Sequence, residues 1–220
     1  MYKQLLTRQI KNLAAQHSAD ITGVADLKLL SGIFTQPSDL LEKYRFGISI
    51  VANLDQYGIY DNATENKAFT LLQKIAEQVE KYIKSKGYKS KIIPCDKRVK
   101  EEGPFYWKGE ISHKAIAKAA GLGWIGKSML LITPKFGPRV CLISILTDID
   151  LVPNEPYENK CGNCKECVKA CPINALTELN FNDHPENLKE VLDVSKCGPY
   201  INKTWDEGRI CWNCLLVCPG

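Results

Sequence analysis

The chain has 220 residues, a hydrophobic fraction of 45% and a formal net charge of +4. Such values suit one domain with an appendage, or two modest domains, and supply enough apolar residues for a core. The small charge gives no sign of a nucleic-acid-binding surface. No run approaches the roughly 18 apolar residues of a membrane span, and residues 1–8 lack the apolar stretch of a secretory signal. We therefore expect a cytoplasmic protein with no membrane segment.

Helix and strand signals alternate through the first half of the chain. Apolar residues at helical spacing predict helices over residues 2–17 and 66–86. Short β-rich runs predict strands over 21–25, 46–52 and 91–94. This alternation favours an α/β or α+β layered core.

The middle of the chain begins with a charged and aromatic loop over residues 99–109. Ser112 is the predicted N-cap of a helix over residues 113–120. Two further strands, 129–133 and 139–147, are separated by a Pro-Lys-Phe-Gly-Pro segment rich in turn residues. That arrangement predicts a β-hairpin.

A run of cysteines follows a Pro-rich linker over residues 151–160. Cys161, Cys164, Cys167 and Cys171 are spaced C-x2-C-x2-C-x3-C, with a proline directly after the fourth. This is the ligand run of a bacterial-type [4Fe–4S] ferredoxin. The spacing therefore predicts electron-transfer chemistry in a reducing compartment.

A second, incomplete copy of the run lies at the C-terminal end. It consists of Cys211, Cys214 and Cys218, with Cys197 standing alone upstream. In two-cluster ferredoxins the cysteine after the x3 step binds the other cluster. The predicted ligand sets therefore cross over, as Cys161, Cys164, Cys167 and Cys218 for one cluster and Cys171, Cys197, Cys211 and Cys214 for the other.

Other interpretations of the cysteines fit less well. Ten cysteines could form a disulfide scaffold, but such scaffolds are short and secreted. C-x2-C pairs also build zinc sites, although zinc does not need the third x2 cysteine followed by x3-C-P. Cys141 lies inside an apolar strand and is interpreted as a small buried hydrophobe, whereas Cys95 at a strand end stays open to a reactive role.

A glycine motif precedes the predicted hairpin. Gly121, Gly123 and Gly126 match the G-x-G-x-x-G dinucleotide fingerprint. That fingerprint needs a strand before it and a helix after it, whereas here a helix precedes and a strand follows. We therefore expect this motif not to bind a dinucleotide. The glycines permit the backbone to approach a large group closely, with Trp124 as a flat apolar wall and Lys127 as a hydrogen-bond donor.

The combination of motifs resembles epoxyqueuosine reductases and, more distantly, cobalamin-dependent reductive dehalogenases. The resemblance covers roughly residues 45–220. It is carried by Ser112-His113-Lys114, by Ala119 to Lys127, by Leu130-Leu131-Ile132, by the Gly137 turn, by Thr147-Asp148, and by the cysteine module including Cys197.

This resemblance implies a nitroreductase-like core that holds a cobalamin, with two [4Fe–4S] clusters feeding electrons to it. The residues expected to line the cofactor site are Gly121, Trp124, Gly126, Lys127 and Ser128. Asp96 is the positional match for the catalytic proton donor, with Tyr106 as an alternative, although Lys97 and Arg98 follow where the family has an Ala-Pro turn. FMN is an alternative cofactor. His113 is interpreted as a helix-face residue in preference to a cobalt ligand.

The predicted architecture is an α/β (α+β) core over residues 1–152 and a ferredoxin-like double-cluster module over residues 153–220. The predicted function is that of an iron–sulfur oxidoreductase, similar to epoxyqueuosine reductase, acting on a small molecule or a modified nucleoside. A ferredoxin or flavodoxin is the expected electron donor, and a tRNA substrate is left open because the family's C-terminal helical repeats are missing from this sequence. The alternative is a ferredoxin-like carrier, or a corrinoid-reducing activator, with no substrate of its own.

Overall fold

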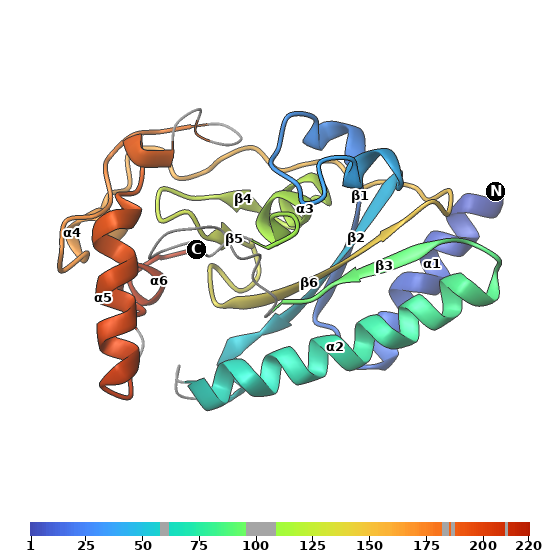
Figure 1. Cartoon of the computed structure of the whole chain (residues 1–220), viewed down its shortest axis with the longest axis horizontal. Coiled ribbons are helices and arrows are strands. Elements are labelled where there is room, and N and C mark those ends of the chain that lie inside the picture. The colour runs from blue at the N-terminus through green and yellow to red at the C-terminus, as the bar shows by residue number, and fades with distance from the viewer. Residues whose placement is uncertain (58–61, 96–108, 182–184, 186–187, 210) are drawn as a thin grey trace.

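The computed structural model describes residues 1–57, 62–95, 109–181, 185, 188–209 and 211–220. Its centre is an antiparallel four-stranded sheet in the order β1-β2-β6-β3 (Figure 1). The strands are β1 (Ile21–Asp26), β2 (Phe46–Asn53), β6 (Val140–Thr147) and β3 (Ser90–Ile93). Short 3-10 helices, η1 (Leu27–Leu30), η2 (Leu40–Glu42) and η3 (Leu54–Tyr57), flank β1 and β2.

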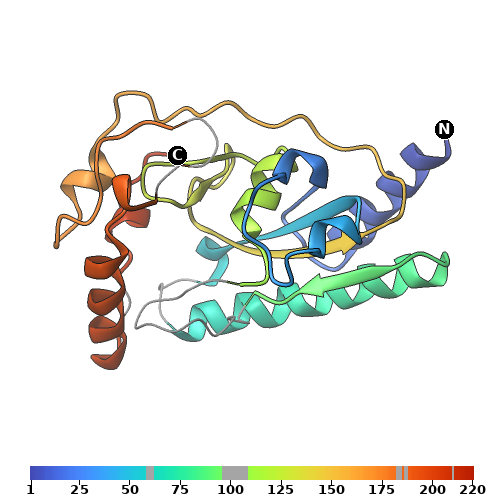
Figure 2. The ribbon, with the colours of Figure 1, turned by 45° about the horizontal axis from the view of Figure 1, so that its top comes forward.

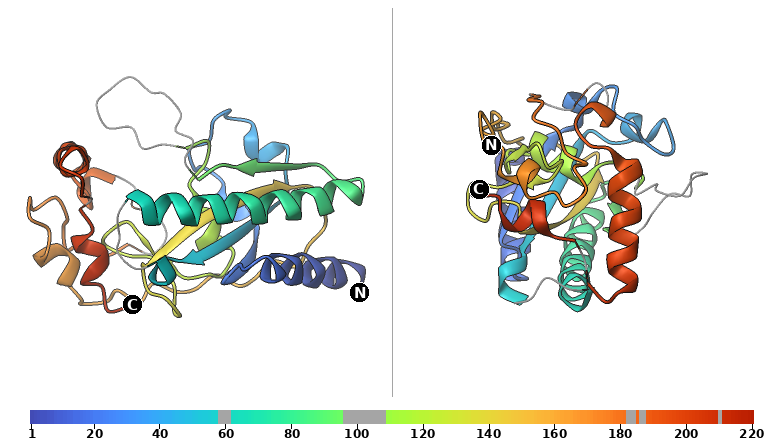
Figure 3. Two further views of the ribbon diagram at one scale, coloured as in Figure 1. Left: turned by 90° about the horizontal axis from the view of Figure 1, so that it is seen from below. Right: turned by 90° about the vertical axis from the view of Figure 1, so that its left-hand side faces the viewer.

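Helices cover both faces of this sheet. Helices α1 (Tyr2–Gln16) and α2 (Asn62–Ser85) lie on one face, as Figure 3 shows from below, and α3 (His113–Ala119) lies on the other. The period-2 alternation of β2 explains this, because Ile48 and Ile50 pack in the α1–α2 core while Val51 packs in the α3 core. Each fully buried side chain of this size contributes roughly 1.5–3 kcal/mol.

The structure confirms the layered α/β class and most of the predicted elements. Helix α2 begins at Asn62, four residues earlier than predicted, and α1 ends one residue earlier, at Gln16. Ser112 does cap α3, since its Oγ accepts a hydrogen bond of 3.3 Å from the backbone N–H of Ala115. The layered core was therefore readable from the hydrophobic pattern.

The predicted hairpin of residues 129–133 and 139–147 is wrong. The turn exists, since Thr133 and Gly137 exchange two backbone hydrogen bonds of 2.9 Å. Its two arms nevertheless join different sheets: β5 (Leu131–Ile132) pairs with β4 (Trp124–Ile125), and β6 enters the central sheet between β2 and β3. A strand buried on both faces gains more from a central position than from a short exposed hairpin.

The cysteine module lies beyond one end of the core and is reached by the linker, which runs along the top of Figure 2 without helix or strand. Asn154 in the linker binds β1: its backbone N–H donates to the carbonyl of Val24 at 2.8 Å, and its Oδ1 accepts from the Val24 N–H at 3.0 Å. The module contains α4 (Glu166–Lys169), η4 (Leu188–Glu190), α5 (Val194–Asp206) and α6 (Asn213–Leu216). Within the described residues, the model has no helix with both the length and the apolar character needed to cross a membrane.

Candidate functional site

Two similar loop-helix units carry the cysteine runs. Cys167 lies in α4 and Cys214 in α6, and each of these four-residue helices is followed by a further cysteine and a proline. The two helices contact each other, and the Asn213 side chain donates to the carbonyl of Ala170 at 3.4 Å. The incomplete second copy of the motif therefore folds like the first and packs against it.

The eight cysteine thiols influence one another's pKa mostly within two sets of four. Burial raises the pKa of Cys167, and the thiols of Cys161, Cys218 and Cys164 raise it further. Burial likewise raises the pKa of Cys214 to about 12, with further contributions led by Cys211 and Cys197. The outer group comprises Cys161, Cys164, Cys167 and Cys218; the inner group comprises Cys171, Cys197, Cys211 and Cys214.

Cys171 and Cys218 each lie with the group of the other run. Cys171 raises the pKa of Cys197, whose value reaches about 11, mainly through burial. Cys218 is influenced by Cys161 and Cys164 in the same way. These influences follow the crossed sets that the spacing predicts, and the ligand sets themselves stay a prediction.

Such groups are suited to a cationic centre. Buried thiols that raise one another's pKa resist ionisation until a positive centre lies between them, and binding of a metal then releases their protons. No three His, Cys, Asp or Glu side chains of the described residues converge as ligands of one ion. A [4Fe–4S] cluster does not require that, because its four cysteines bind four different iron atoms.

Backbone amides already point at several of the sulfur atoms. The N–H of Ala175 donates to Cys171 Sγ at 3.2 Å. The amides of Val168 and Gly220 hydrogen-bond the thiols of Cys167 and Cys218 and lower the pKa of each. Hydrogen bonds of this kind stabilise bound thiolates and tune the potential of a cluster. The donor set and its surroundings thus fit two [4Fe–4S] clusters.

The core contacts the outer group through the turn between β4 and β5. The Lys127 side chain is 3% exposed, and its Nζ donates to the carbonyl of Gly162 at 2.6 Å and to that of Cys164 at 2.9 Å. A Cβ on Gly126 would lie 3.2 Å from Cys161 Sγ. Only a glycine therefore lets the backbone of the core approach this sulfur so closely.

Asn159 fastens the same junction from the side of the linker. Its Nδ2 donates to the carbonyl of Ile125 in β4 at 2.9 Å and to the carbonyl of Phe181 at 2.8 Å. Its Oδ1 accepts from the N–H of Cys161 at 2.9 Å. One amide side chain thus connects the core, the first ligand and the far side of the module.

The five residues predicted to line a cofactor site lie against the chain's own atoms. A Cβ on Gly121 would lie 2.3 Å from the carbonyl oxygen of Glu155. Trp124 is 4% exposed, with Lys160 Nζ 5.9 Å from its ring centroid, and Ser128 is buried. Gly126 and Lys127 meet the cysteine loop as described. Their role in holding a corrinoid stays a prediction.

The predicted proton donors Asp96 and Tyr106 lie outside the described residues. His113 has both ring nitrogens engaged, with Nδ1 2.9 Å from Ser144 Oγ and Nε2 3.2 Å from the carbonyl of Pro94. Burial lowers its pKa. These contacts agree with the interpretation of His113 as a residue of the helix face. Cys141 is 7% exposed within the core, as predicted.

Sequence reasoning overlooked Lys114 as a functional residue. Its Nζ donates to the carbonyl of Met129 at 2.5 Å. Burial lowers the pKa of Lys114, and the nearby thiol of Cys214 partly offsets this effect. Lys114 follows a predicted N-cap by two residues, where a cation opposes the helix dipole, and that conflict was the available signal.

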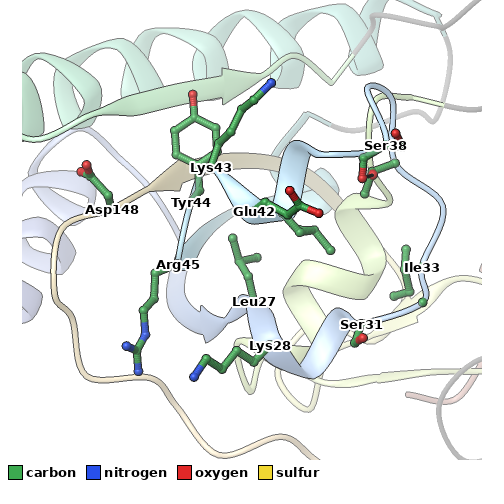
Figure 4. A pocket seen from close by; sticks show the side chains of 13 residues that line it. Leu27, Lys28, Ser31, Ile33, Ser38, Glu42, Lys43, Tyr44, Arg45 and Asp148 are labelled. Carbon is green, nitrogen blue, oxygen red and sulfur yellow. Dashed lines mark hydrogen bonds between the residues drawn. The ribbon is translucent and has the colours of Figure 1, made fainter.

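A pocket of about 810 Å³ was also missed; it opens on the side of the core formed by η1, η2 and the start of β2. Figure 4 shows Lys28, Lys43, Arg45 and Asp148 among the residues that line it. Two of its cations have partners, since Lys43 pairs with Asp39 at 2.7 Å and Arg45 lies 3.9 Å from Asp26. No residue of the cysteine module lines this pocket.

Comparison with known proteins agrees with this geometry. The model of the 4Fe-4S binding domain family matches residues 155–177. An epoxyqueuosine reductase from Gloeobacter violaceus is 46% identical over 92 residues, which are 42% of this chain and 26% of that protein. The resemblance to epoxyqueuosine reductases predicted from the sequence is thus confirmed.

Two solved structures share the fold. A structure of epoxyqueuosine reductase with an epoxyqueuosine-modified tRNA-Tyr stem loop has a TM-score of 0.66 at 20% identity, and covers 98% of this chain and 65% of that one. A reductive dehalogenase, whose structure suggests a mechanism for B12-dependent dehalogenation, has a TM-score of 0.75 at 21% identity, and covers 96% and 31%. The chain spans between 26% and 37% of the length of the curated relatives that it matches.

Proposed function

We propose that this protein is an iron–sulfur oxidoreductase that holds two [4Fe–4S] clusters in the outer and inner cysteine groups and passes electrons to its core. The observation that carries the proposal is that eight thiols influence one another's pKa mostly within two crossed sets of four. The raised pKa values, the amide–sulfur hydrogen bonds and the match to the 4Fe-4S binding domain family support it.

Electron entry through the outer group is the second part of the proposal. Cys164 of this group is exposed, whereas Cys214 of the inner group is partly buried near Lys114. A donor such as a ferredoxin or flavodoxin would therefore approach the outer cluster, and the inner cluster would face the core. Lys127 of the core binds the loop of the outer group, and Lys114 of the core lies near Cys214 of the inner group.

We also propose that the core uses cobalamin and that the substrate is a modified nucleoside or another small molecule. The relatives support this, since one structural neighbour is described for B12-dependent dehalogenation and another was solved with a modified tRNA stem loop. When bound, a corrinoid supplies a metal centre that can be strongly reducing. Asp96 as the proton donor, and the division into domains at residues 152 and 153, are parts of the same proposal.

Anaerobic purification with quantification of iron and cobalt, with and without added cobalamin, tests this function. We expect about eight irons per chain, as two four-iron clusters require, and one cobalt per chain. Eight irons without retained cobalamin would contradict the corrinoid part, and zinc in place of iron would contradict the whole proposal.

A second candidate is an electron carrier or corrinoid-reducing activator without a substrate of its own. The observation that favours it is the packing of the glycine motif, where Gly121, Gly123 and Gly126 face the chain's own atoms within 2.5 Å of an added Cβ. Turnover of a small molecule by the cobalamin-loaded protein would exclude this candidate. The absorbance spectrum of released cofactor distinguishes both from a protein that binds FMN.

A further inference from the structure

We propose that Lys127 is a positioning residue for the outer [4Fe–4S] cluster, which it serves by holding the ligand loop and by placing a positive charge beside the cluster. This inference rests on the proposed function, because it requires that cluster. It differs from the predicted role of Lys127 as a contact to a corrinoid.

The first argument is the direction of the contacts of Lys127. Its ammonium donates to the carbonyls of Gly162 and Cys164, at 2.6 and 2.9 Å, while Gly162 and Cys164 are themselves exposed. The loop between the first two ligands therefore turns its carbonyls inward to one buried cation. Two such charge-assisted hydrogen bonds fix the loop more firmly than neutral ones would.

The second argument is the lack of a counter-ion. Lys127 is 3% exposed, yet in the described part of the chain no carboxylate forms an ion pair with it. A buried charge is costly unless it is compensated by an opposite charge and by hydrogen bonds. A cluster with four thiolate ligands carries a net negative charge and would supply the missing compensation.

The third argument is the rigidity of the turn that carries Lys127. The N–H of Gly126 donates to the carbonyl of Leu130 at 2.9 Å, and the N–H of Met129 donates to that of Gly126 at 2.8 Å. A Cβ added to Gly126 would lie 3.2 Å from Cys161 Sγ, and Asn159 joins Ile125 to the Cys161 amide. The ammonium is thus held at a fixed place relative to the first ligand.

A fixed cation beside a cluster stabilises the reduced form, which is the more negative, over the oxidised form. Removal of the charge therefore lowers the midpoint potential of that cluster. We expect Lys127→Met to lower the equilibrium constant for one-electron reduction of one cluster at least tenfold. This corresponds to a midpoint potential lower by at least about 59 mV. The potential of the inner cluster should stay unchanged.

The test is a redox titration followed by electron paramagnetic resonance on the anaerobically reconstituted protein. It compares wild type, Lys127→Met, Lys127→Arg and Lys165→Met. Lys165 is a matched control, because it lies in the same loop next to Cys164 but is about half exposed and pairs with Glu178. Iron content and circular dichroism are measured on the same samples.

The proposal is supported if Lys127→Met lowers one of two potentials, with most of the shift restored in Lys127→Arg and less than half of it seen in Lys165→Met. Selective loss of about four irons, with the fold retained, supports it as well. It is overturned if Lys127→Met leaves iron and both potentials unchanged, if Lys165→Met shifts the potential equally, or if both clusters are lost together. A wild-type protein that takes up no iron would instead refute the proposed function itself.

Discussion

Replacement of Asn159 by alanine should loosen the cysteine module from the core. The substitution removes three hydrogen bonds of 2.8–2.9 Å, two donated to the carbonyls of Ile125 and Phe181 and one accepted from the N–H of Cys161. At about 1 kcal/mol for each bond, the loss is about 3 kcal/mol. For a chain of this length, 1 kcal/mol shifts the melting temperature by roughly 2–4 °C, so Tm should fall by roughly 6–12 °C.

The assay is thermal unfolding of the iron-loaded protein, followed by far-ultraviolet circular dichroism and by cluster absorbance. Asn163→Ala is the control. It removes a side chain of the same type from an exposed position nearby in the sequence. We expect the control to unfold within about 0.5 kcal/mol of wild type. A melting temperature of Asn159→Ala within about 2 °C of wild type would refute the reasoning, since 2 °C corresponds to at most about 1 kcal/mol.

Three other outcomes are expected. Cys218→Ala should reduce iron from about eight to about four per chain, whereas Cys141→Ala leaves it unchanged; loss of all iron or of none would contradict the crossed ligand sets. Ile116→Ala, at a fully buried position of α3, should lower the free energy of unfolding by about 2–5 kcal/mol in urea titrations, and Leu29→Ala, which is 60% exposed, by less than about 0.5. Burial lowers the pKa of His113 below its usual value, so the unfolded chain takes up a proton that the folded chain does not as pH falls through about 6.5. Stability should then fall by up to about 1.4 kcal/mol per pH unit, and an equal slope in His113→Gln would contradict this assignment.

The parts of the fold predicted well from the sequence are those determined by local patterns. Helical spacing predicted α1 and α2 to within a few residues, and Ser112 marked the start of α3. The spacing of the cysteines marked the iron–sulfur module, since the 4Fe-4S binding domain family matches residues 155–177. In each case the information lies within a few neighbouring residues.

The predictions that failed concern contacts between distant segments. The Thr133–Gly137 turn was recognised, but β6 pairs with residues of β2 that lie 87 to 101 positions away in the sequence, and no local signal encodes that choice. The pocket beside η1 and η2 was also not predicted; residues within the segment 27–45, together with Asp148, line it. The bond from Lys114 to the carbonyl of Met129 was not predicted either.

The glycine motif illustrates how a local signal of close backbone approach leaves the neighbouring atoms unspecified. The sequence indicated close backbone approach, and Gly123 and Gly126 do lie where an added Cβ would meet Ile132 at 2.0 and 2.4 Å. The partner, however, is the chain itself, because the short β4–β5 ribbon folds back onto its own turn. This tight packing presents Lys127 to the ligand loop and brings the backbone against Cys161 Sγ. The motif therefore acts at the junction of the core and the outer cysteine group, where electrons would enter the molecule.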